Sequence, residues 1–183
     1  MPGYGVSKVA VIAVVVAVVA VAGVLMFMLV PRGPETLKLE TYEFGFNGPS
    51  GGPQITVKVG DTLRITLVNK GGSDHEFMIV KDMKGLLTRL SEKVKELQSR
   101  GLKEEQITES EEVEEIMDEY VAIKLLVGGK EATEAEVDPG QTLEYSVTFN
   151  ERGTYYYLCS KFTATFPQTH ADKGMYGTIV VEG

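Results

Sequence analysis

Few side chains in this sequence offer a thiolate or an imidazole to a metal ion. Cys159 is the single cysteine, and His75 and His170 are the two histidines of the 183 residues. The thioether of Met175 follows His170 closely. Thiolate and thioether sulfur favour Cu(I), while imidazole also tolerates Cu(II). If these four side chains converge, we expect them to hold one copper ion in both oxidation states and to exchange single electrons.

Short predicted β-strands surround these residues. Apolar and polar residues alternate strictly in residues 55–59, which is typical of a strand with one buried face. Further short runs are separated by turns rich in glycine, proline and asparagine, and they comprise residues 36–46, 63–68, 75–80, 134–137, 143–149, 154–159 and 177–181. His75 begins one run, Cys159 ends another, and His170 lies in the loop that follows. The pattern predicts an all-β sandwich of two sheets.

Residues 82–121 interrupt the strand pattern with two predicted amphipathic helices. In the first helix the apolar residues recur at helical spacing, namely Leu86, Leu90, Val94 and Leu97. Gly101 is placed to end it, and Thr108 with Glu111 resembles a capping box for the second helix. Between positions 103 and 119 there are nine acidic residues and one lysine. This acidic surface either faces solvent or docks a basic redox partner, and both interpretations stay open.

An uncharged apolar run occupies residues 9–30. As a helix with a rise of about 1.5 Å per residue it would span roughly 33 Å, which is enough to cross the core of a bilayer. A cleaved signal peptide is the alternative, although the run is long for a signal and no small-x-small cleavage site follows it. We therefore expect a membrane anchor in residues 1–30, a linker in 31–35, and a folded domain in 36–183 on the extracytoplasmic side.

The charge and cysteine content exclude some function classes. The formal net charge is −8 at pH 7, which argues against nucleic acid as a partner. A single cysteine cannot form a disulfide within the chain. Both histidines already belong to the proposed copper set, so no further histidine is left for a second, catalytic copper. We therefore expect a protein that is not an enzyme and has no small-molecule substrate.

Three motifs resemble the cupredoxins, the family of plastocyanin, azurin and auracyanin. Residues 68–77 (VNKGGSDHEF) resemble the loop that delivers the family's first histidine, and residues 153–159 (GTYYYLC) resemble its cysteine strand. Residues 170–178 (HADKGMYGT) are similar to the end of its C-terminal copper loop. The resemblance covers residues 36–80 and 122–183. It implies a Greek-key cupredoxin sandwich with a two-helix insertion.

The same resemblance implies a ligand set for type 1, or blue, copper. Its equatorial ligands would be His75, Cys159 and His170, and its axial ligand would be Met175. The sequence departs from the family in one place, because residues 160–169 make the segment between Cys159 and His170 longer than usual. Thr165-Phe166-Pro167 resembles the azurin-type approach to the histidine, which places the extra residues near 161–164.

The surroundings of the copper set can also be predicted. Backbone N–H groups near Asn69 and Glu76 should donate hydrogen bonds to the thiolate of Cys159. An apolar rim around His170, the expected electron exit, should consist of Phe166, Pro167 and Tyr176. We interpret Tyr155 and Tyr157 as core aromatics, because both share the face of Cys159 on the strand.

The sequence therefore predicts an electron-transfer protein of the membrane surface. Its partners would be redox proteins such as a cytochrome, an oxidase or another respiratory complex. A copper-binding or chaperone module without an electron-transfer role is the main alternative. A binuclear copper domain is disfavoured because Thr163 stands where its second cysteine would lie.

Overall fold

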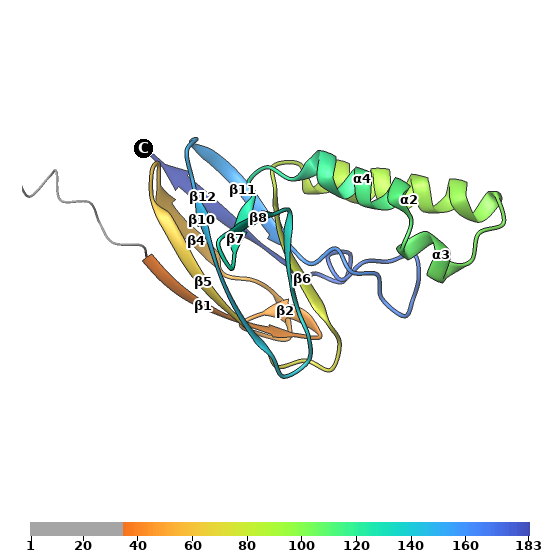
Figure 1. Cartoon of the computed structure of the whole chain (residues 1–183), viewed down its shortest axis with the longest axis horizontal. Helices are drawn as coiled ribbons and strands as arrows, with labels where there is room; N and C mark the ends of the chain where they lie inside the picture. The colour runs from red at the N-terminus through yellow and green to blue at the C-terminus, as the bar shows by residue number, and fades with distance from the viewer. Residues whose placement is uncertain (1–34) are drawn as a thin grey trace, which may run out of the picture. The chain divides into compact units, whose positions relative to one another are not determined.

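The computed structural model describes residues 35–183 (Figure 1). The predicted anchor and most of the predicted linker lie outside these residues. Within residues 35–183, no helix combines the length and the apolar character needed to cross a membrane.

Two β-sheets account for most of the described chain. The first has, in spatial order, the strands β3 (Ser50–Gly51), β2 (Phe44–Phe46), β1 (Glu35–Tyr42), β5 (Thr62–Asn69), β10 (Thr142–Thr148), β7 (Leu125–Val127) and β8 (Lys130–Ala132). The second has β4 (Gln54–Lys58), β12 (Tyr176–Glu182), β11 (Gly153–Leu158), β6 (His75–Val80) and β9 (Glu134–Val137). The predicted β-sandwich is therefore confirmed.

The main core lies between the inner faces of the two sheets. In β5 the residues Leu63, Ile65 and Leu67 are buried at every second position. Each of these side chains contributes roughly 1.5–3 kcal/mol of stability when it is fully buried. Tyr155 and Tyr157 from the second sheet are also buried in this core, as the sequence indicated.

Strand direction brings the chemically active residues to one end of the second sheet. Strand β11 lies between β6 and β12 and is antiparallel to both. The end of β11, where Cys159 follows, is therefore next to the beginning of β6, where His75 lies. It is also next to the beginning of β12, which His170 and Met175 precede. Three segments distant in sequence thus meet at one edge.

The insertion between β6 and β7 contains the helices α2 (Met83–Ser99), α3 (Glu104–Thr108) and α4 (Glu111–Tyr120). The two predicted helices are confirmed, and the short α3 was missed because it buries only Ile107.

The predicted capping box is wrong. The Thr108 hydroxyl donates to the carbonyl of Glu105 in α3, at 3.2 Å, and Ser110 is the residue that precedes α4.

A second apolar cluster joins these helices to the sandwich. Met78, Val80 and Leu158 point from β6 and β11 toward the insertion, where they meet Leu86 and Leu90 of α2. Strand β6 is consequently buried along its whole length. The helices pack against this part of the second sheet, and Figure 1 shows α2 and α4 extending to one side of the sandwich, beyond β6 and β11.

Candidate metal centre

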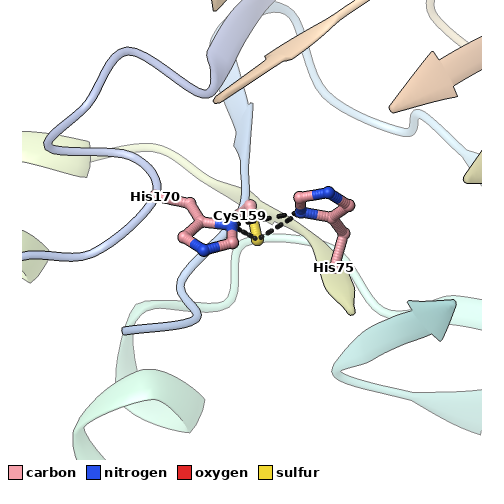
Figure 2. Close-up of side chains that lie close together, drawn as sticks. All are labelled: His75, Cys159 and His170. Carbon is pink, nitrogen blue, oxygen red and sulfur yellow. Dashed lines mark hydrogen bonds between the residues drawn. The ribbon is translucent and has the colours of Figure 1, made fainter. Parts of the chain in front are cut away.

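The side chains of His75, Cys159 and His170 converge in the structure (Figure 2). The two Nδ1 atoms are 3.1 Å apart. The sulfur of Cys159 is 3.9 Å from Nδ1 of His75 and 3.5 Å from Nδ1 of His170. The exposed fractions of the three residues are 0%, 0% and 4%. One sulfur and two ring nitrogens therefore point at a common, enclosed position.

The size of this triangle fits a bound metal ion. A point equidistant from the three atoms lies about 2.0 Å from each, near the ~2.0–2.3 Å typical of nitrogen and sulfur ligands. Nε2 of His75 is buried and has no hydrogen-bond partner among the described residues. His75 is thus held by packing, with Nδ1 turned toward Cys159 and His170. The cluster is consistent with one copper ion.

The backbone holds the thiol of Cys159 in place. The N–H of Glu76 donates a hydrogen bond to its sulfur at 3.3 Å, as predicted. The corresponding prediction for Asn69 is wrong, because its N–H donates to the carbonyl of Gln141 at 3.0 Å. The Asn69 side-chain amide instead donates to the carbonyls of Ser73 and Val137, at 2.8 and 3.0 Å. Asn69 therefore shapes the loop that leads into His75.

Met175 is fully buried and is joined to both neighbouring donor residues through the backbone. Its carbonyl accepts from the N–H of Cys159 at 3.1 Å, and its N–H donates to the carbonyl of His170 at 2.9 Å. These bonds place Met175 at the same end of the sandwich. Its role as an axial donor stays a prediction.

The long segment between Cys159 and His170 is a small hairpin. The N–H of His170 donates to the carbonyl of Lys161 at 2.7 Å, and Phe162 pairs with Thr169 in an antiparallel bridge. The N–H of Ala171 returns to the carbonyl of Cys159 at 2.9 Å. Because the hairpin closes on itself, the extra residues do not separate the two donor side chains.

The aromatic neighbour of His170 is Phe44, not the predicted Phe166. Phe44 of β2 meets the imidazole edge-to-face, with ring centroids 5.5 Å apart. Phe166 pairs with Phe162 at 5.1 Å, and both pack against the cluster formed with the insertion. Pro167 lines a groove with Leu87 of α2. The prediction of Phe166 in the rim is therefore wrong, because Phe166 packs with Phe162 against the apolar cluster of the insertion.

Burial determines the protonation of the donor side chains. It lowers the pKa of His75 to about 4, and the neighbouring His170 contributes to the shift. Burial also lowers the pKa of His170 and raises the pKa of the Cys159 thiol. At neutral pH the two imidazoles are therefore neutral and offer their lone pairs, whereas the thiol must lose a proton before it binds a metal.

A network of charged side chains lies beside the donor atoms, and the sequence did not predict it. The ammonium of Lys161 lies 2.7 Å from Glu136, 2.9 Å from Asp74 and 3.2 Å from Glu76. Glu76 also accepts from the hydroxyl of Ser160 at 2.6 Å. Burial alone would lower the pKa of Lys161, but the three carboxylates raise it. Lys161 therefore stays charged at neutral pH.

No family model matches this sequence, and no curated protein matches it either. Several solved structures are similar in shape at low sequence identity. The dithionite-reduced auracyanin of Roseiflexus castenholzii is 20% identical and has a TM-score of 0.48, with 82% of this chain and 100% of that chain covered. Auracyanin A of Chloroflexus aurantiacus, described as a blue copper protein, is 19% identical with a TM-score of 0.48 and the same coverage.

A copper enzyme also appears among the similar structures. The copper nitrite reductase of Nitrosomonas europaea is 18% identical with a TM-score of 0.46, and the match covers 82% of this chain and 42% of that chain. The chemistry of this chain is inferred from its own donor atoms.

Proposed function

We propose that this chain is a cupredoxin-type protein that holds one copper ion and carries single electrons. The observation that carries the proposal is the buried convergence of two imidazole nitrogens and one cysteine sulfur, all within 3.9 Å of one another. His75, Cys159 and His170 would be the equatorial ligands, and Met175 the weak axial one.

The donor set favours copper and redox chemistry. Bound in a His₂Cys set with a weak axial thioether, copper supplies a one-electron Cu(I)/Cu(II) couple. The chain contributes rigidity, because the N–H of Glu76 fixes the sulfur and the hairpin bonds fix His170. Donors held by the backbone need little rearrangement between two oxidation states. This rigidity supports electron carriage.

Electron exchange should occur through His170. His75 is completely buried, whereas His170 keeps 4% of its surface exposed. The ring of Phe44 lies against His170 and would take the place of Phe166 in the predicted rim. A partner that docks over Phe44 would lie beside the ring of His170.

The partner is proposed to be a redox protein at the outer face of a membrane, where the apolar residues 9–30 would anchor the chain. Exposed carboxylates on α3 and α4 support a basic partner, since they would raise its rate of encounter. Glu104 and Glu105 of α3 and Glu111 of α4 are exposed. Glu112, by contrast, is paired with Lys93 and Arg100.

A chaperone function is less well supported than electron carriage. A chaperone passes its metal to another protein, and its donor atoms must therefore be accessible to that protein. Here the equatorial donors lie in residues that are 0–4% exposed. Such burial favours retention of the ion.

A spectroscopic redox cycle tests the proposed function. The purified full chain, loaded with copper and oxidised, should show an intense thiolate-to-copper absorption band in the visible range. The band should disappear on reduction with ascorbate and return on oxidation, with one electron counted per copper. A parallel sample loaded with zinc should stay colourless. A copper-loaded chain that lacks the band, or that reduces irreversibly, would refute electron carriage.

A further inference from the structure

The charged network around Lys161 joins the three segments that carry the donor atoms. Lys161 lies in the hairpin that follows Cys159, and its carbonyl accepts the N–H of His170 at 2.7 Å. Its ammonium contacts Asp74 and Glu76, the residues on either side of His75. One residue thus connects the surroundings of all three proposed equatorial ligands, through its carbonyl and its ammonium.

Glu76 links this network directly to the sulfur. Its N–H donates to Cys159 at 3.3 Å, while its carboxylate accepts from Ser160 and contacts Lys161. The Glu76 side chain is only 9% exposed, so water screens its charge weakly. Ser160, whose hydroxyl donates to this carboxylate, directly follows Cys159, and Lys161 comes next along the chain. Both charged side chains therefore adjoin the segment that carries the sulfur.

We propose that Lys161 and Glu76 are positioning residues that form a charged clamp, and that the balance of their two charges sets the reduction potential of the centre. The inference rests on the proposed function. The oxidised centre carries one positive charge more than the reduced centre. A nearby carboxylate therefore stabilises the oxidised form and lowers the potential, and a nearby ammonium raises it.

Three substitutions separate this electrostatic role from a merely structural one. Lys161→Met removes the ammonium, so that the negative charges of the neighbouring carboxylates are no longer balanced. The midpoint potential should therefore fall. Glu76→Gln keeps the shape of the side chain and its contact with Ser160 but removes the negative charge, so the potential should rise. Lys161→Arg keeps the charge and should stay close to the unchanged protein. The double variant Lys161→Met/Glu76→Gln should return toward the original potential.

The experiment is a redox titration of the copper-loaded full chain and the four variants, followed through the visible band. A second readout is the unfolding midpoint of each metal-free protein, which shows how far each change disturbs the fold. Lys161→Met and Glu76→Gln break the same ion pair, and a purely structural role would therefore shift both potentials in the same direction. Opposite shifts support the clamp.

The outcomes are distinguishable from failure of the proposed function. If the unchanged protein shows no visible band with copper, electron carriage itself is refuted. If the bands are intact but the two single variants shift together, or neither shifts, the charged clamp is overturned while the copper centre stands. If Lys161→Met does not fold, the midpoint potentials of the other two single variants decide between the outcomes. A raised potential for Glu76→Gln with an unchanged potential for Lys161→Arg supports the clamp, and any other pair of results overturns it.

Discussion

Replacing Cys159 with alanine should abolish the visible band and weaken copper binding by more than about 100-fold, because the loss of a ligand exceeds the 10–100-fold effect typical of outer-shell changes. The sulfur is the only thiolate that the chain can offer. It is also the donor whose charge-transfer transition gives the colour. His75 and His170 alone leave a two-nitrogen site, which does not produce that transition. The measurement is a copper titration followed by absorption and by competition with a chelator.

Met175→Leu is the matched control for the cysteine variant. It removes the proposed axial thioether but leaves the three equatorial donors in place. The band should persist, and only the reduction potential should change, since the axial ligand tunes it.

The metal-free Cys159→Ala protein should lose about 1 kcal/mol of unfolding free energy, on the scale of one buried methylene group. A blue Cys159→Ala protein would contradict the ligand assignment.

The apparent affinity for Cu(I) should rise about tenfold for each pH unit between roughly pH 6.5 and 8. Burial raises the pKa of Cys159, so the thiol is protonated throughout this range and releases one proton when the metal binds. Burial also lowers the pKa of His75, to about 4, and that of His170. The two imidazoles are then already neutral and release none. A steeper slope should begin only well below the ordinary histidine pKa near 6.5.

Anaerobic competition with a Cu(I) chelator at a series of pH values measures this slope. The proton affinity of the chelator is corrected separately. Met175→Leu should show the same slope, because a thioether has no proton to release. A flat profile would mean that the thiolate is already formed in the metal-free protein. A slope of two or more above pH 6.5 would mean that burial does not keep the histidines neutral.

The meeting of His75, Cys159 and His170 was expected from the resemblance of three sequence motifs to the cupredoxins, and the strand directions of the structure explain it. A strand that ends at Cys159 and antiparallel neighbours that begin near His75 and after Met175 must bring those residues to one edge. The small number of candidates also helped, since the chain has one cysteine and two histidines. The two-sheet sandwich followed from short alternating runs separated by turns.

The surroundings of the donor set depend on contacts between segments far apart in sequence, which periodicity does not reveal. Phe44 reaches His170 from the first sheet, and Lys161 reaches Glu136 from the hairpin. Nothing in the local sequence at these positions marks the pairings. Phe166 was assigned to the rim because it precedes His170, but the insertion competes for that ring more effectively. Side-chain partners of this kind are fixed only when the whole domain packs.

Anomalous diffraction at the copper absorption edge, from crystals of the copper-loaded chain, tests the central claim most directly. We predict a single strong peak enclosed by the sulfur of Cys159 and the Nδ1 atoms of His75 and His170. A peak bound elsewhere, or a copper that contacts either histidine without the sulfur, would contradict the account.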